Sequence, residues 1–178
     1  MKNTKLTSTW VRCGYASPLG PMTLAASEQG LTGCWFDGQK HMPDISRWAV
    51  QNDHPTLQQA AAELQRYFAG ETATIQVALD IRVGTDFQQA VWRALLGIAS
   101  GQTLSYGELS QQIGRATAVR AVGAAVGRNP ISLFIPCHRV VGANGALTGY
   151  AGGLDRKHAL LHLERGQATP SAQGTIAG

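Results

Sequence analysis

Three copies of one short pattern constrain this chain more than any other feature. Ser or Thr followed three residues later by Gln or Glu occurs at Thr56, Thr85 and Ser105, each time before apolar residues at helical spacing. Such a pair satisfies the free backbone N–H groups at a helix start, an arrangement called a capping box. The glycines placed to end these three helices are Gly70, Gly101 and Gly114. The chain is therefore expected to form at least three capped helices after residue 55.

The first third of the chain is organised differently. Between residues 10 and 36, short β-prone runs alternate with turn sequences at residues 17–20 and 28–30. Turns at this spacing predict an antiparallel meander. Residues 37–55 have no clear period, and we expect a loop there with one short helix.

These patterns predict an α/β chain of the α+β type. We expect a small N-terminal antiparallel-sheet domain over residues 1–84 and a mainly helical C-terminal domain over residues 85–167. The boundary falls in the polar, β-branched stretch 71–84. Residues 168–178 are of low complexity and are expected to form a disordered tail.

A helix pair in the second half resembles a helix-turn-helix. The helix after Ser105 should be followed, past Gly114, by a second helix from about Thr117 to Val126. That helix would carry Val119, Val122 and Val126 on one side. The motif has no unique sequence code, so an ordinary helical hairpin remains an alternative. Arginines in and around the second helix favour DNA binding, namely Arg115, Arg120 and Arg128.

Charge is distributed unevenly along the chain. The formal net charge is +4, from 15 Lys and Arg against 11 Asp and Glu. Residues 1–84 hold seven of each sign, so the whole excess lies in residues 85–178, with eight basic and four acidic side chains. A basic second half favours an anionic partner such as nucleic acid.

The cysteine count and the absence of long apolar runs bear on the compartment. Cys13, Cys34 and Cys137 make an odd number with no Cys-x-x-Cys pair, which argues for a reducing compartment rather than a disulfide framework. No run approaches the length of a membrane span. We expect a cytoplasmic protein without a membrane partner.

The sequence around Cys137 is the best candidate for a reactive site. The apolar run at residues 131–135 is expected to be a buried strand that ends at Pro136, directly before Cys137 and His138. A thiol reacts as thiolate and needs a nearby base or positive charge, which His138 and Arg139 could supply. Glu164 could orient the imidazole if the last helix folds back. A lone cysteine is also often a small buried hydrophobe, so both readings stay open.

Five glycines around Tyr150 indicate tight turns and close approach of the backbone to a ligand. They are Gly142, Gly145, Gly149, Gly152 and Gly153. A flexible loop is the alternative, but the apolar residues between these glycines favour a pocket wall.

The stretch from about Thr85 to Gly166 resembles the O6-alkylguanine-DNA alkyltransferases, also called methylated-DNA–protein-cysteine methyltransferases. The resemblance rests on PCHRV, on RAVGAAVGRNP and on GYAGG, in this order and spacing. Upstream it includes FQQAVWRALLGIASGQTLSYGELSQQIG, and more loosely SPLGPMTLA and LQRYFAGE in the first half. It implies a ribonuclease-H-like support domain over residues 1–84, followed by a DNA-binding and alkyl-acceptor domain.

The resemblance also implies a single-turnover reaction. Cys137 would accept the alkyl group of O6-alkylguanine in duplex DNA irreversibly, after the base has been flipped out, with O4-alkylthymine a second candidate substrate. His138 would ionise Cys137 through a water, and Glu164 would hold His138, as in a hydrolase triad. Asn129 would brace the turn at the site, and the Tyr106 hydroxyl would donate to the departing guanine.

Further positions are implied for DNA and base contacts. Arg120 would enter the base stack where the target nucleotide has left. Small or apolar residues would let the second helix approach the minor groove, namely Ala118, Val119 and Ala121. Phosphate contacts would come from Arg115, Arg128 and Lys157. The base pocket would be lined by Tyr150, Val140 and Ala151.

The same resemblance implies no cofactor, because the protein itself is the acceptor. We expect no metal, since Cys13, Cys34, His41 and His54 follow no zinc-ligand spacing. The partner would be double-stranded DNA, bound by a monomer, with cooperative loading a further candidate property. Two other functions remain open: an alkylated-DNA-binding helix-turn-helix protein without chemistry, and a Cys-His hydrolase built on Cys137, His138 and Glu164.

Overall fold

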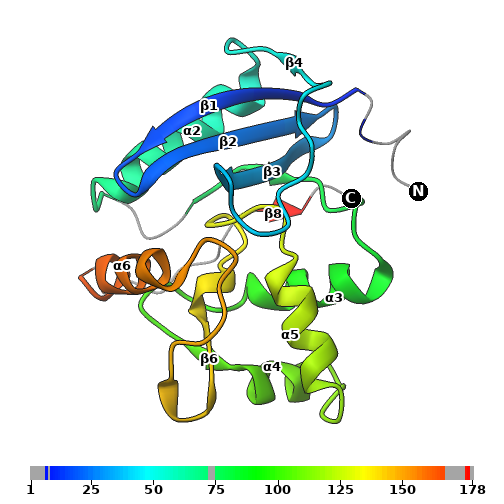
Figure 1. The fold of residues 1–178 in the computed structure, drawn as a ribbon, viewed down its shortest axis with the longest axis vertical. Helices are drawn as coiled ribbons and strands as arrows, with labels where there is room; N and C mark the ends of the chain where they lie inside the picture. The colour runs from blue at the N-terminus through cyan, green and yellow to red at the C-terminus, as the bar shows by residue number, and fades with distance from the viewer. Residues whose placement is uncertain (1–6, 8, 72–74, 167–174, 177–178) are drawn as a thin grey trace.

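The computed structural model describes residues 7, 9–71, 75–166 and 175–176, and its N-terminal half is built on a mixed sheet (Figure 1). The sheet has six strands in the order β4-β1-β2-β3-β5-β8. Their bounds are β1 Val11–Ser17, β2 Gly20–Ser27, β3 Gly30–Phe36, β4 Ala49–Val50, β5 Ala78–Leu79 and β8 Thr175–Ile176. The first three pair antiparallel in succession, which confirms the predicted meander.

Helix α2 (Pro55–Phe68) covers one face of this sheet (Figure 1). Its buried residues, Leu57, Ala60, Leu64 and Tyr67, recur at helical spacing and face the strands. They share one core with the buried side chains of the meander and with the apolar residues of the second half. The two halves of the chain are therefore packed around a continuous core.

Some expectations for the first half and the tail are wrong. The described residues between β3 and α2 contain no helix; Ala49 and Val50 instead pair parallel with β1. The capping box at Thr56 does not form, because Pro55 occupies the first helical turn and moves the cap to His54, which makes no side-chain cap. Most of residues 168–178 lie outside the described part, but Thr175 and Ile176 form β8 rather than a disordered tail.

The second half is mainly helical, as predicted. Its helices are α3 Asp86–Leu95, α4 Tyr106–Gln112, α5 Val119–Gly127 and α6 Leu154–Arg165. Both remaining capping boxes form. Thr85 Oγ1 accepts from the N–H of Gln88 at 3.2 Å, and Ser105 Oγ accepts from the N–H of Glu108 at 3.1 Å. In turn, the side-chain oxygens of Gln88 and Glu108 accept hydrogen bonds from the backbone N–H groups of Thr85 and Ser105, respectively.

Helices α4 and α5 form the predicted helix-turn-helix, and α3 supports them from behind (Figure 1). The Trp92 indole N–H donates to the Ala125 carbonyl at 2.8 Å and ties α3 to α5. Val122 and Val126 are buried as expected, but Val119 is 40% exposed. The reason is that α5 begins only at Val119, so its first turn projects beyond the core.

Strand β3 joins the two halves. Its early residue Leu31 pairs with β5, while Cys34 pairs with the segment that leads to Cys137. The Cys34 N–H donates to the Pro130 carbonyl at 2.9 Å, and the Ser132 N–H donates to the Cys34 carbonyl at 3.0 Å. The backbone before Cys137 is thus held by the sheet of the other half.

The apolar run at residues 131–135 is not the strand that the sequence predicts. It is a tight buried turn in which the Ile135 N–H donates to the Ile131 carbonyl at 2.9 Å, and Leu133 has a φ of 73°. A short apolar run fits a buried turn as well as a buried strand, because burial alone does not fix backbone shape.

None of the helices in the described part of the chain has both the length and the apolar content needed to span a bilayer.

We expect Thr85→Ala to lower the free energy of unfolding by about 1 kcal/mol, because it removes a formed helix cap. Thr56→Ala is the matched control, since no cap forms there, and it should change stability by less than about 0.5 kcal/mol. Urea denaturation of both variants checks this. Equal losses would contradict the assigned caps.

Candidate functional site

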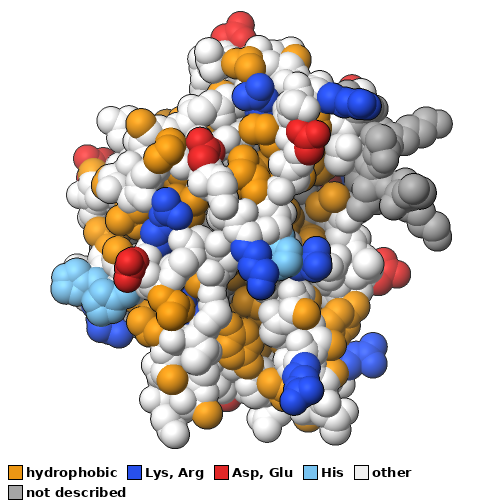
Figure 2. Space-filling model, in the orientation of Figure 1, with side chains coloured by type: hydrophobic (Ala, Val, Ile, Leu, Met, Phe, Trp, Pro, Cys, Tyr) orange, Lys and Arg blue, Asp and Glu red, His pale blue; other side chains and the backbone are white. Residues whose placement is uncertain are grey.

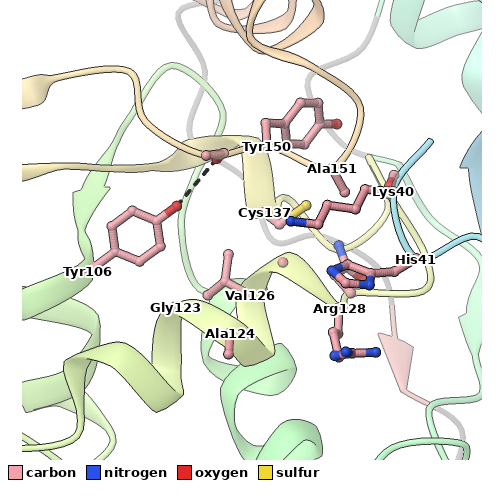
Figure 3. Close-up of a pocket in the computed structure, with 14 residues that line it drawn as sticks. Lys40, His41, Tyr106, Gly123, Ala124, Val126, Arg128, Cys137, Tyr150 and Ala151 are labelled. Atoms are coloured by element: carbon pink, nitrogen blue, oxygen red, sulfur yellow. Dashed lines mark hydrogen bonds between the residues drawn. The ribbon is translucent and has the colours of Figure 1, made fainter.

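Cys137 borders a pocket of about 430 Å³ at the junction of the two halves (Figure 3). It begins a one-turn 3-10 helix, η1 (Cys137–Arg139), and is only 6% exposed. The pocket is also lined by the second half of α5, by the glycine-rich segment after the site and by residues 40–41. A buried thiol at the side of an open cavity suits reaction with a ligand that enters the pocket.

Burial raises the pKa of the Cys137 thiol above its ordinary value. The Asn129 side chain, the charge of Lys157 and the backbone N–H groups of Cys137 and His138 act in the opposite direction without cancelling the burial. The resting thiol is therefore protonated at neutral pH, and its use as a nucleophile requires a base.

A buried carboxylate lies behind the thiol. Glu164 Oε1 is 2.6 Å from His138 Nε2 and accepts the Tyr67 hydroxyl at 2.7 Å. Arg139 donates through both arms of its fork, at 2.8 Å to Oε1 and 2.9 Å to Oε2. Burial would raise the pKa of Glu164, but the interactions with His138 and Arg139 outweigh it and hold that pKa well below the ordinary range.

This carboxylate fixes the tautomer of His138. An ionised carboxylate only accepts hydrogen bonds, so Nε2 carries a hydrogen, and in the neutral imidazole Nδ1 presents a lone pair. The Nδ1 atom is buried and has no hydrogen-bond partner among the described residues. His138 is thus oriented as a hydrogen-bond acceptor, next in sequence to the thiol.

Asn129 spans the turn before Cys137. Its Nδ2 donates to the Ile135 carbonyl at 2.8 Å, and its Oδ1 accepts from the Ile131 N–H at 3.0 Å. The side chain is buried, so both bonds are shielded from water. These two bonds hold the tight turn that the apolar run adopts in place of a strand.

Two tyrosines flank the pocket. Tyr106, the first residue of α4, donates to the Thr148 carbonyl at 3.4 Å and to the Gly149 carbonyl at 3.5 Å; the second bond is drawn in Figure 3. Burial, and then the charge of Cys137, raise the pKa of its hydroxyl, so it stays protonated. Tyr150 and Ala151 line the other wall. Burial also raises the pKa of the Tyr150 hydroxyl well above its ordinary value.

Lys157 does not lie where the sequence places it. Predicted as a phosphate contact, it is fully buried, and its Nζ donates to the carbonyls of Val140, Thr148 and Gly149 at 2.5, 3.0 and 3.3 Å. It therefore ties the pocket wall to α6. Its charge also stabilises a thiolate at Cys137.

The other predicted residues separate into two groups. Arg128 lines the pocket, whereas Val140 does not: it lies in β7 (Val140–Val141), paired with Leu104 of β6 (Leu104–Ser105). Outside the pocket, at or before the first turn of α5, lie Arg115, Ala118, Val119, Arg120 and Ala121. All of these are exposed except Ala118, which is half-buried.

Sequence reasoning missed Tyr67, Lys40 and His41. Tyr67 lies 97 positions from Glu164, and no local pattern predicts a contact over that distance. Lys40 and His41 belong to a loop of the first half. The total charge of that half is zero, so the sum gives no sign that Lys40 lies at the site. Only the fold brings these residues to the site.

Comparisons with known proteins agree across both halves. Residues 86–166 match the family model described as 6-O-methylguanine DNA methyltransferase, DNA binding domain. Residues 11–81 match the one described as 6-O-methylguanine DNA methyltransferase, ribonuclease-like domain.

Individual relatives cover most of the chain. A methylated-DNA–protein-cysteine methyltransferase of Mycobacterium tuberculosis is 51% identical over 152 residues, 85% of this chain and 90% of that protein. One of Methanosarcina acetivorans is 48% identical over 151 residues, 84% of this chain and 95% of that protein.

Solved structures of such methyltransferases share the fold of this chain. The crystal structure of the Mycobacterium tuberculosis O6-methylguanine methyltransferase has a TM-score of 0.81 at 48% identity, covering 90% of this chain and 96% of that one. The crystal structure of that organism's OGT in complex with DNA has a TM-score of 0.79 at 48% identity, covering 90% of this chain and 94% of that one.

We expect Glu164→Gln to change the pH dependence of stability. A carboxyl whose pKa is lowered by folding stabilises the protein above its unfolded pKa of about 4.3 and loses that contribution as pH falls. The variant lacks this titration and leaves Arg139 without a carboxylate, at a cost of about 3–5 kcal/mol near pH 7.

Denaturation of both proteins at several pH values checks this expectation. The difference in unfolding free energy should shrink below about pH 4. Glu63→Gln is the control: it removes a partly exposed i,i+3 ion pair with Arg66, and its amide oxygen can still accept from the Gln76 N–H. A difference that stayed constant with pH would contradict the ionised state of Glu164.

Proposed function

This chain belongs to the family of methylated-DNA–protein-cysteine methyltransferases, and we propose that it repairs duplex DNA by moving the alkyl group of O6-alkylguanine irreversibly to its own Cys137. The observation that carries the proposal is the placement of Cys137. A buried thiol lines a pocket beside a helix-turn-helix, with a buried His138–Glu164 pair behind it.

The reaction is a single displacement. The Cys137 sulfur attacks the alkyl carbon, a C–S bond forms, and the bond between that carbon and guanine O6 breaks with its electron pair on the base. The departing guanine then takes up a proton. A thioether is a poor leaving group for water, so each molecule reacts once and the protein is consumed.

His138 is the base that ionises the Cys137 thiol. Because burial keeps Cys137 protonated at rest, a base must take its proton, and the Nδ1 lone pair of His138 is the acceptor that Glu164 orients. We place a water between the two groups, as in the relay that the family resemblance implies. The charge of Lys157 then stabilises the thiolate that forms.

Tyr106 is the hydrogen-bond donor to the departing base. Its hydroxyl remains protonated because burial raises its pKa, so it can donate to the departing base from the pocket wall. On the opposite wall, Tyr150 and Ala151 contact the extruded base. Asn129 keeps the turn before Cys137 in place, which fixes the sulfur relative to both walls.

The helix-turn-helix binds the duplex and presents the damaged base. An alkylated O6 is hidden in the base stack, so the nucleotide must leave the duplex to reach Cys137. The exposed first turn of α5 enters the minor groove through Ala118, Val119 and Ala121, and Arg120 fills the space that the base vacates. Arg115 and Arg128 contact phosphates.

The chemistry also bears on the setting in which the protein works. All three cysteines are free, and an alkyl acceptor must stay reduced to function. We therefore place the protein in the reducing cytoplasm, acting as a monomer on DNA without a cofactor.

The main test uses a duplex containing one O6-methylguanine. After incubation, the intact mass should rise by a single methyl group, and a peptide map should locate it on Cys137. Cys137→Ala should still bind the damaged duplex and show no mass change, because only the acceptor atom is lost.

Other outcomes point to other functions. Binding by the wild-type protein with no mass change would identify a recognition protein without chemistry. Repeated turnover of an ester or peptide would favour a Cys-His hydrolase. A methyl group on another residue would overturn the assignment of Cys137.

Arg120→Ala should reduce the affinity for damaged DNA more than the affinity for undamaged DNA, since the guanidinium occupies the duplex only when a base has left it. Fluorescence of a base analogue beside the lesion reports extrusion directly. Arg93→Ala, on the exposed side of α3, is the control. Equal losses on both duplexes would contradict the role in extrusion.

A further inference from the structure

Basic side chains from both halves of the chain meet at the pocket that holds Cys137. Lys40 and His41 come from the loop after β3, and Arg128 follows the last turn of α5. Figure 3 shows the His41 ring between Lys40 and Arg128. The first half, neutral by its total charge, therefore contributes the positive charge of Lys40 to this pocket.

The loop that carries Lys40 and His41 is held by hydrogen bonds rather than left free. The Lys40 N–H donates to the Ala151 carbonyl of the pocket wall at 3.2 Å. Behind it, the buried Gln39 side chain accepts from the Phe36 N–H at 2.9 Å. His41 adopts a φ of 66°, a conformation that costs a non-glycine residue free energy. These contacts fix the loop against the pocket.

The three side chains have no acidic partner. No ion pair among the described residues involves Lys40, His41 or Arg128. Desolvation, followed by the charges of Arg128 and Lys40, lowers the pKa of His41, which shows that the three groups lie within electrostatic range. Figure 2 shows a His side chain flanked by Lys or Arg side chains near the middle of this face, with no acidic side chain beside them.

We propose that Lys40, His41 and Arg128 form a phosphate subsite at the pocket mouth, which holds a backbone phosphate of the DNA strand whose nucleotide is extruded. The subsite is two-sided, with Lys40 and His41 from the sheet half and Arg128 from the helical half. This inference rests on the proposed function and adds to it a DNA contact made by the first half.

The geometry of extrusion requires an anion near this point. A base that reaches Cys137 remains attached through its sugar to the strand, so its flanking phosphates stay at the entrance of the pocket. Lys and Arg are the side chains that neutralise such phosphates, and each contact releases condensed counterions. A phosphate between Lys40 and Arg128 would also relieve the repulsion between the two cations.

The test compares two variants that each remove one positive charge from the same loop region. Lys40→Ala removes a cation at the pocket, and Arg47→Ala removes an exposed one that does not line it. Both are made in the Cys137→Ala background, so that no transfer occurs during titration of a duplex containing O6-methylguanine.

We expect Lys40→Ala to weaken binding and to reduce the slope of log K against log salt by about 0.9, the value for one lost phosphate contact. Arg47→Ala should leave the slope unchanged. On an undamaged duplex, where no nucleotide enters the pocket, the effect of Lys40→Ala should be smaller. Combining Lys40→Ala with Arg128→Ala should cost less affinity than the sum of the single losses, because both contact one phosphate.

The proposal is overturned if Lys40→Ala and Arg47→Ala have equal slopes, or if the losses from Lys40→Ala and Arg128→Ala simply add. Thermal melting of each variant shows whether the fold is retained. Failure of the proposed function would be visible separately: the wild-type protein would gain no methyl group on Cys137 from the O6-methylguanine duplex, whereas loss of the subsite alone leaves that transfer intact.

Discussion

The buried carboxylate of Glu164 is the interaction on which the rest of the structure depends. An ionised group removed from water is tolerated only when its oxygens are fully hydrogen-bonded. It accepts four hydrogen bonds. One comes from Tyr67 at the end of α2 in the first half, and three come from His138 and Arg139, the two residues of η1 that follow Cys137. The hydrogen bonds that satisfy this one charge therefore tie α2 to α6, orient His138 and hold the turn that carries Cys137. The chemistry and the packing of the two halves share the same hydrogen bonds.

The environment of Cys137 combines two opposing influences. Burial favours the neutral thiol, while Asn129 and Lys157 favour the thiolate. A protein that is consumed by its reaction gains from this balance, since a thiol that is protonated at rest resists oxidation and unselective alkylation. The base that we propose, His138, is the next residue in the chain and is held by Glu164.

Local sequence patterns predicted local structure well and long-range contacts poorly. The boxes at Thr85 and Ser105 formed because each needs only a partner three residues away. The box at Thr56 failed because a neighbouring proline set the helix start. Lys157 was misplaced because a sequence displays a charge but not its burial, and the run at residues 131–135 was misread because an apolar segment does not encode a turn. The family resemblance predicted a site at Cys137, His138 and Glu164, and the structure places the last two in contact, but neither the resemblance nor periodicity indicated Tyr67.

The pairing of Cys34 with the segment before Cys137 limits how the sheet half of such a protein can be replaced. The reactive turn completes a strand edge that belongs to the other half, and the Tyr67 hydroxyl completes the charge cluster behind it. The two halves are thus not interchangeable modules. A chimaera that kept residues 85–166 and took its sheet from an unrelated protein would need a matching strand edge and a hydroxyl at the same depth. Fusion to a foreign scaffold would separate the nucleophile from its support.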